Sequence, residues 1–142
     1  MTTLRILIVE DEQIIVLDLK IRLKKLGYDV VATASSGLEA IEAASRTHPD
    51  LALMDITLAG DMDGVQAALE LRLRFDVPSV FLTARTDEAT LARAKLTKPL
   101  GYVLKPLDEV TLCRTIKAAL ESRNREWEQR RWEKKAKSSN QI

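Results

Sequence analysis

Acidic side chains stand directly after the first apolar run of the chain. In "RILIVEDE", residues 5–12, four apolar residues are followed at once by Glu10, Asp11 and Glu12. Another acid, Asp55, closes a later apolar run, "LALMD". Carboxylates that are held close together raise one another's pKa unless a cation compensates them. Oxygen ligands with room for a few waters suit Mg²⁺, so a shared magnesium site is one chemistry that these acids could support.

Two further polar residues end apolar runs later in the chain. "SVFLT" ends at Thr83, and "GYVLKP" places Lys105 directly before Pro106. A hydroxyl donor and an ammonium group beside a metal–carboxylate site are what a phosphoryl group needs. Taken singly, such a threonine can cap a helix, such a lysine can be solvated, and acids after a strand can begin a helix, the role expected for Glu12. Phosphoryl chemistry therefore depends on a fold that brings these residues together.

Short apolar runs alternate with helix-like stretches along the chain. The runs predict strands over residues 4–9, 30–34, 51–55, 79–83 and 101–104. Because they are nearly continuous in apolar residues, both faces of the sheet should be covered. Helices are predicted over residues 13–26, 37–47, 64–74 and 88–96, and a last one begins near Leu107 without a clear stop before Ser138.

Residues that cap or end helices support these boundaries. Gly27 is of the type that terminates a helix, Ser35 or Ser36 could cap the second, and Thr86 or Asp87 could cap the fourth. Strict alternation of five strands and five helices favours a parallel sheet with helices on both faces. The expected fold class is α/β, a three-layer doubly wound sandwich around a parallel five-stranded sheet.

This fold class gives the polar strand ends a common location. In the flavodoxin-like strand order 2-1-3-4-5, the first and third strands are neighbours at the point where the order reverses. Ligands of such sheets bind there, outside the carboxyl ends of the strands. Glu10, Asp11 and Asp55 are therefore expected in one shallow cleft, with Thr83 and Lys105 converging on it from the next two strands.

As an ordered set, these motifs resemble the receiver domains of two-component response regulators. The resemblance is carried by the pair Glu10–Asp11, the isolated Asp55, "TA" at 83–84 and "YVLKP" at 102–106. It runs from about residue 4 to residue 122. No single motif is specific to this family. The ordered set is specific to it, because the spacings and the alternation of strands and helices also match.

The resemblance assigns roles to the residues of the cleft. It implies that Asp55 accepts the phosphoryl group, and that Mg²⁺ is held by Glu10, Asp11, Asp55 and the backbone carbonyl of Thr57. Thr83 would donate a hydrogen bond to the incoming phosphoryl group.

The strand that ends at Lys105 receives the remaining roles. Lys105 would form an ion pair with the phosphoryl group, and Tyr102 matches the aromatic position whose rotation accompanies activation. The Lys105–Pro106 bond matches a cis peptide of the family, which a bond to proline permits at low energetic cost.

The implied function is a phosphorylation-dependent signalling switch of a two-component phosphorelay. The phosphodonor would be a histidine kinase or a phosphotransfer protein, and the output a downstream effector protein or domain. Such a domain is not an enzyme in the usual sense, because it catalyses only its own phosphorylation and dephosphorylation. Two alternatives remain: a pseudo-receiver that binds partners without phosphorylation, and a Mg²⁺-dependent aspartyl-phosphate phosphatase. Phosphatases of the haloacid-dehalogenase type carry a second acid two residues after the nucleophile, where this chain has Thr57.

Two departures from the usual receiver pattern concern the cleft. Many receivers read Asp-x-x-x-Pro-x-x-x-Gly after the phosphoacceptor, whereas "DITLAGDMDG" has Ala59 in place of proline and one extra residue before Gly64. A longer turn at Gly60–Asp61 is expected, with Asp61 and Asp63 as solvated turn residues. The acid pair is also Glu–Asp instead of Asp–Asp, and the longer arm of a glutamate can still reach the ion.

Composition indicates a globular protein outside the membrane. The chain has 142 residues, 46% of them hydrophobic and 30% charged, and Cys113 is its single cysteine, which excludes a disulfide framework. No apolar run is long enough to span a bilayer and no secretory signal pattern is present, so a cytoplasmic protein is expected.

Charge divides the chain into a body and a tail. Residues 123–142 carry seven Lys or Arg and three Glu, a net charge of +4, while the rest carries −3. We therefore expect a receiver domain over 1–122 and a basic helical extension or linker over 123–142, and no direct binding to nucleic acid. Trp127 and Trp132 are expected to lie off the body, where they could serve a partner chain, so a homodimer is possible.

Overall fold

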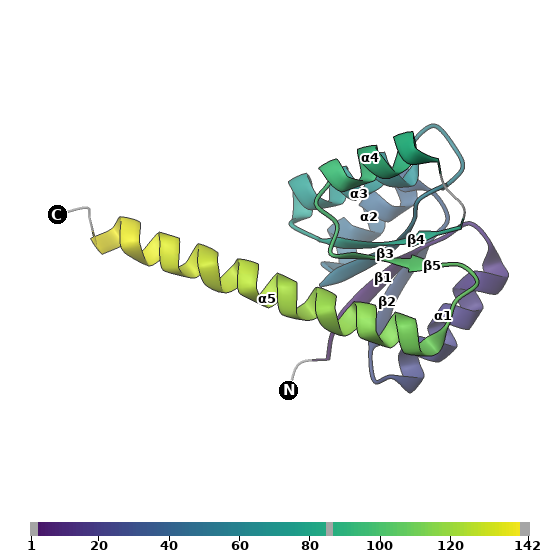
Figure 1. The fold of residues 1–142 in the computed structure, drawn as a ribbon, viewed down its shortest axis with the longest axis horizontal. Helices are drawn as coiled ribbons and strands as arrows, with labels where there is room; N and C mark the ends of the chain where they lie inside the picture. The colour runs from purple at the N-terminus through teal and green to yellow at the C-terminus, as the bar shows by residue number, and fades with distance from the viewer. Residues whose placement is uncertain (1–2, 85–86, 140–142) are drawn as a thin grey trace.

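The computed structural model describes residues 3–84 and 87–139, in which strands and helices alternate without exception (Figure 1). The five strands are β1 (Arg5–Val9), β2 (Asp29–Ala34), β3 (Leu51–Asp55), β4 (Ser79–Thr83) and β5 (Gly101–Leu104). The five helices are α1 (Gln13–Lys25), α2 (Gly37–Thr47), α3 (Gly64–Phe75), α4 (Glu88–Leu96) and α5 (Glu109–Ser139). These bounds lie within two residues of the predicted ones.

The strands form one parallel sheet in the order β2-β1-β3-β4-β5. Helices α1 and α5 cover one face, and α2, α3 and α4 cover the other, as Figure 1 shows. The core on the α1–α5 side contains Leu19, Leu23 and Ile116, whereas the core on the opposite side contains Phe81 and Leu71. The predicted three-layer, doubly wound fold with strand order 2-1-3-4-5 is thus confirmed.

The two edge strands depart from the prediction that both faces of every strand are covered. Every residue of β3 and β4 is buried, whereas all but one residue of β2 and all but one of β5 are half-buried or exposed, Leu104 among the exposed ones. An edge strand has a neighbour on one side only, and the flanking helices lie over the middle of the sheet. An apolar run alone does not distinguish an edge strand from a central one.

Polar side chains cap the starts of α2, α3 and α4. Ser36 caps α2 by accepting a hydrogen bond from the Glu39 N–H at 3.2 Å, and Asp87 caps α4. Asp63 caps α3, forms a reciprocal capping box with Gln66, and pairs with a charged residue of α4. The expectation that Asp63 is a solvated turn residue was therefore wrong, because a cap at this position satisfies free N–H groups of α3. The alternative cap Thr86 lies outside the described residues.

Helix α5 is longer than the body of the domain. Its 31 residues span roughly 46 Å at 1.5 Å per residue, and its yellow end projects beyond the sheet in Figure 1. The helix runs unbroken through the predicted boundary at residue 122, so the division there stays a prediction. Beyond that boundary, three ion pairs connect α5 to the body: Arg123–Asp50 at 3.5 Å, Glu126–Arg72 at 3.3 Å and Arg130–Asp76 at 2.7 Å.

The two tryptophans of α5 differ in their surroundings. Trp132 is 71% exposed, as expected for a side chain off the body. Trp127 instead lies under the guanidinium of Arg123, 4.3 Å from its ring centroid, and borders a cavity at the base of the sheet. Among the described helices, none has the length and apolar content that a membrane crossing requires.

Candidate functional site

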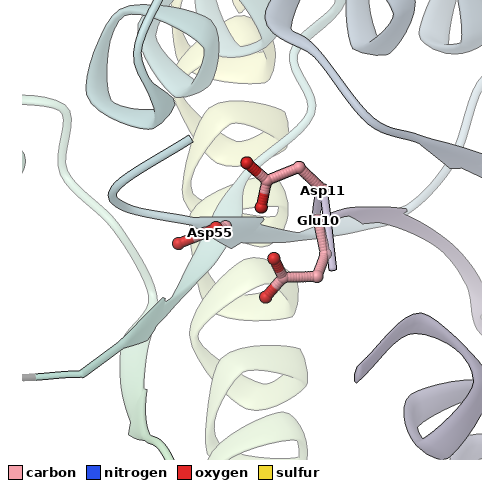
Figure 2. A group of neighbouring side chains, drawn as sticks. All are labelled: Glu10, Asp11 and Asp55. Carbon is pink, nitrogen blue, oxygen red and sulfur yellow. The ribbon is translucent and has the colours of Figure 1, made fainter. Parts of the chain in front are cut away.

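Three carboxylates meet where β1 and β3 end. Glu10 and Asp11 follow β1 directly, Asp55 is the last residue of β3, and the two strands pair in register up to Val9 and Met54. One carboxylate oxygen of each acid lies within 4.8 Å of the others, and Figure 2 shows the three side chains gathered at this edge. Glu10 and Asp55 are buried, whereas Asp11 is exposed. The structure therefore brings together the three acids that the sequence placed at neighbouring strand ends.

Backbone contacts hold Glu10 at the switch point of the sheet. β1 lies between β2 and β3, and its residues from Ile6 to Val9 are fully buried. The Glu10 N–H donates to the Ala34 carbonyl at 3.0 Å, and Glu10 Oε2 accepts a hydrogen bond from the Glu12 N–H at 3.2 Å. Glu12 itself is exposed and occupies the N-cap of α1 without a side-chain cap, in keeping with its expected place at a helix start.

Lys105 supplies the positive charge of the site. It follows β5, and its backbone N–H donates to the Thr83 carbonyl at 2.7 Å. Its ammonium lies 2.5 Å from Glu10 Oε1 and 3.6 Å from Asp55 Oδ1, and its side chain is 14% exposed. The Lys105–Pro106 peptide bond is cis. One lysine thus contacts both buried carboxylates.

Thr57 contacts Asp55 in a way that the sequence did not predict. Both its N–H, at 3.0 Å, and its hydroxyl, at 3.1 Å, donate to Asp55 Oδ1. An Asp that accepts hydrogen bonds from the second residue after it is a common local arrangement, so the Asp-x-Thr spacing is the signal that could have revealed it. These bonds fix the orientation of the Asp55 carboxylate. The proposed use of the Thr57 carbonyl as a metal ligand stays a prediction.

Gly64 is a further residue of the site whose role was missed. A Cβ at this first residue of α3 would lie 1.9 Å from the backbone oxygen of Asp55. The start of α3 therefore packs directly on the backbone that carries the Asp55 side chain. A glycine at a helix start has many explanations, and only the tertiary structure reveals so close an approach.

Thr83 and Tyr102 lie on β4 and β5, the two strands beyond β3 in the sheet. Thr83 is buried at the end of β4, one residue after Leu82, which pairs with Asp55, and its hydroxyl donates to the Ala84 carbonyl at 2.9 Å. The Tyr102 ring stacks on Phe81 with centroids 6.0 Å apart. Its hydroxyl is buried and finds no hydrogen-bond partner in the described part of the chain, and burial raises the pKa of this phenol.

We expect Tyr102→Phe to raise the free energy of unfolding by about 1 kcal/mol at pH 7, because a buried hydroxyl without a partner costs roughly that much. Urea denaturation of the unphosphorylated protein measures the change. Tyr28→Phe is the matched control, since the Tyr28 hydroxyl is not among the buried unpaired groups, and it should change stability by less. A loss of stability in Tyr102→Phe would mean that this hydroxyl has a partner in solution.

The electrostatics of the cluster favour a bound cation. Burial raises the pKa of Glu10 to about 7, opposed by Lys105 and reinforced by the neighbouring Asp55. Burial lowers the pKa of Lys105, but the carboxylates of Glu10 and Asp55 outweigh it and the net direction is upward. Lys105 thus offsets only one of the three negative charges when all three acids are ionised. An oxygen-only donor set with excess negative charge and one exposed member fits Mg²⁺.

In metal-free protein, the Glu10 carboxyl should make stability depend on pH. The pKa of this carboxyl is about 7 in the folded state, against an ordinary value of 4.5. The folded state therefore keeps the proton longer, and this contribution to stability falls as pH rises from about 4.5 to 7. The free energy of unfolding of Glu10→Gln minus that of the wild type should therefore grow by about 3 kcal/mol over this interval. Urea denaturation in chelator at several pH values measures the difference. The same difference for Glu12→Gln, an exposed acid, should stay nearly flat, and equal slopes for the two variants would contradict the assignment.

Comparison with known proteins agrees with this geometry. The family model described as response regulator receiver domain matches residues 6–117. The transcriptional regulatory protein PdtaR of Mycobacterium tuberculosis is 38% identical over 122 residues, 86% of this chain and 58% of the relative. The phyllosphere-induced regulator PhyR of Methylorubrum extorquens is 34% identical over 116 residues, 81% of this chain and 43% of the relative.

A solved structure shows the same fold over most of the chain. The signal receiver domain of a modulated diguanylate cyclase from Desulfovibrio desulfuricans superposes with a TM-score of 0.84 at 39% identity, and covers 88% of this chain and 99% of that one. The chain spans about half the length of the curated relatives it matches. The family match, the sheet order and the strand-end residues agree, and the chain belongs to the response regulator receiver domain family.

Proposed function

We propose that this receiver domain is a phosphorylation-dependent switch that accepts a phosphoryl group on Asp55 from a histidine kinase or a phosphotransfer protein. The observation that carries the proposal is the position of Lys105, whose ammonium contacts Glu10 and Asp55 at the same time. A buried ion pair of this kind is costly to maintain for structure alone, whereas phosphoryl transfer requires a cation at this place.

The residues of the cleft have distinct tasks in this reaction. Glu10, Asp11, Asp55 and the Thr57 carbonyl would hold Mg²⁺, which when bound supplies positive charge next to the phosphoryl oxygens. A carboxylate oxygen of Asp55 attacks phosphorus, its new bond to phosphorus forms as the bond to the donor atom breaks, and the product is an acyl phosphate. Hydrogen bonds from the Thr57 N–H and hydroxyl to Oδ1 orient the carboxylate for this attack.

Lys105 and Thr83 respond to the new phosphoryl group. Lys105 moves its ammonium from the carboxylates to an oxygen of the phosphoryl group, which as a whole carries more negative charge than a carboxylate does. The Thr83 hydroxyl exchanges its bond to the Ala84 carbonyl for a bond to another phosphoryl oxygen. These contacts exist only when Asp55 is phosphorylated, so phosphorylation shifts the population of conformations toward the one in which they form. In that conformation, Tyr102 can take up the space that Thr83 leaves.

Acetyl phosphate tests the proposal without a cognate kinase. Incubation of the full chain with acetyl phosphate and Mg²⁺ should add one phosphoryl group in intact-mass spectrometry, and none with chelator present. Asp55→Asn should gain none, whereas Asp61→Asn, which changes an exposed acid of the neighbouring loop, should behave as the wild type. A wild type that stays unmodified would support a phosphorylation-independent interaction module. Rapid hydrolysis of p-nitrophenyl phosphate without an adduct would support a phosphatase.

The output of the switch is proposed to be a downstream effector protein or domain. The long α5 would connect the receiver to it, as a linker or as an element of a homodimer, in a cytoplasmic protein. Its projecting end carries the exposed Trp132 and a basic surface, which are available to a partner chain. Light scattering with and without acetyl phosphate measures the oligomeric state, and a monomer under both conditions would exclude the dimer.

A further inference from the structure

A cavity of about 570 Å³ lies at the end of the sheet opposite to Asp55. Its wall is made by the start of β1, the turn before β2, the residue before β3 and the middle of α5. Because all five strands are parallel, their starts lie at the edge that is farthest from the acidic cluster. The volume falls within the range of small-molecule sites, roughly 300–1,000 Å³. This cavity, which we call the base cavity, has no part in the proposed phosphoryl transfer.

Four apolar or aromatic side chains line the base cavity. Leu4, just before β1, and Leu120 of α5 contribute aliphatic surface. Tyr28 and Trp127 contribute two aromatic rings. Two aromatic rings and two leucines around one opening favour a flat, apolar body as occupant.

Two nitrogen atoms of a buried guanidinium in the wall, that of Arg123, lack hydrogen-bond partners in the described part of the chain. The side chain of Arg123 is 12% exposed, and its Nε and Nη1 atoms are buried without an acceptor within the described chain. Nη1 lies 3.5 Å from Asp50 Oδ1, too far for a good hydrogen bond, while Nη2 donates to the Asn124 side chain. Buried N–H groups without acceptors are rare and costly, and they indicate that an acceptor is missing.

The charges around the base cavity do not cancel. Arg5 and Arg123 are positive, and Asp50 is the single acid in the lining, so one positive charge is left over. Asp50 is also occupied, because its Oδ2 accepts a hydrogen bond from the Arg5 N–H at 2.9 Å. A ligand with one negative charge would balance the site and supply the acceptor that Arg123 lacks.

We propose that the base cavity binds a small aromatic carboxylate, with its ring against Tyr28 and Trp127 and its carboxylate at Arg123, whose guanidinium already lies over one face of the Trp127 ring. Such a ligand would bridge α5 to the start of the sheet, and would therefore stabilise the packing of the long helix on the body. Binding is independent of Asp55 chemistry, so Asp55→Asn should bind as the wild type does. Failure of the switch and failure of this site are thereby distinguishable.

Two probes of the same shape test the proposal on the unmodified chain. Titration with 2-naphthoate and with the neutral 2-naphthylmethanol, followed by ¹H–¹⁵N NMR, should give saturable binding of the carboxylate about tenfold tighter than of the alcohol, since a charged hydrogen bond distinguishes them. Shifts should concentrate at the Gly27 and Tyr28 amides and the Trp127 indole N–H. Equal affinities, shifts centred elsewhere, or a response that does not saturate would overturn the proposal.

Variants on α5 separate the two parts of the site. Arg123→Met should weaken 2-naphthoate about tenfold and leave the alcohol unchanged, whereas Arg131→Met, an exposed residue of the same helix, should affect neither. Trp127→Leu should weaken both probes, and Trp132→Leu neither. If Arg123→Met fails to fold, the tryptophan pair and the wild-type probe comparison still decide. Unchanged binding in Trp127→Leu would contradict the site.

Discussion

Replacing Lys105 with methionine should lower the free energy of unfolding of metal-free protein by about 3 kcal/mol at pH 8, and should slow phosphorylation of Asp55 roughly a hundredfold. Glu10 and Asp55 are both buried, Glu10 is charged at pH 8 because its pKa is about 7, and in the described chain Lys105 is the residue that pairs with both. Methionine keeps the apolar stem and removes the ammonium. The loss of stability reports the cost of leaving two buried carboxyl groups without their cationic partner. The loss of rate reports the stabilisation that the ammonium gives to the phosphoryl group during transfer.

Two measurements separate these effects. Urea denaturation in chelator gives the stability change, which should shrink at pH 5, where Glu10 takes up a proton because burial raises its pKa to about 7. Intact-mass time courses with acetyl phosphate and Mg²⁺ give the rate. Lys117→Met, which removes an exposed lysine of α5, should match the wild type in both. If Lys105→Met were phosphorylated at the wild-type rate, the proposed role of this ammonium would be wrong.

Gly64→Ala should destabilise the domain by about 3 kcal/mol or more and nearly abolish phosphorylation. The new Cβ would lie 1.9 Å from the backbone oxygen of Asp55, which is far closer than these two atoms can approach without a bond. Neither atom can rotate away, since the backbone sets the position of the Cβ and the oxygen is itself a backbone atom. Either α3 or the end of β3 must shift, and a shift of the end of β3 displaces the Asp55 carboxylate from Lys105 and the other acids.

Gly37→Ala is the matched control for this substitution. Gly37 is also buried and also begins a helix, α2, but its Cβ would meet the side chain of Met62 at 2.8 Å. A flexible methionine can move aside, so this variant should lose about 1 kcal/mol or less and keep its phosphorylation. Thermal and urea denaturation with the acetyl phosphate assay measure both variants. Equal losses in the two would show that the helix start, and not contact with Asp55, determines the effect.

The positions of the strand ends followed from the sequence because they depend on pattern and topology. Buried strands in strict alternation with helices permit few windings, and these place Glu10, Asp11 and Asp55 at one edge whatever the details of packing. The structure agrees, with the three acids within 4.8 Å and Lys105 reaching two of them.

Some features of the site were not predicted because they depend on close tertiary contacts. Others depend on local hydrogen bonds, for which the same residues have several possible partners. The approach of Gly64 to Asp55 involves backbone atoms nine residues apart and has no signature in composition. Thr57 could have pointed to solvent, yet its hydroxyl donates to Asp55. Asp63 was placed in a solvated turn, although the Asp-x-x-Gln spacing of a capping box was present. The predicted strand order already made β2 and β5 the edge strands, but their apolar runs alone gave no sign of their partial exposure.

The central claim is that Asp55 is the residue that becomes phosphorylated, and borohydride trapping tests it most directly. Borohydride reduces an aspartyl phosphate to homoserine, so the modified position remains marked through proteolysis and peptide mass spectrometry. After incubation with acetyl phosphate and Mg²⁺, we predict homoserine at position 55, and unchanged aspartate at positions 11, 61 and 63. Homoserine at another acid, or at none while the intact protein carries a phosphoryl group, would contradict the account.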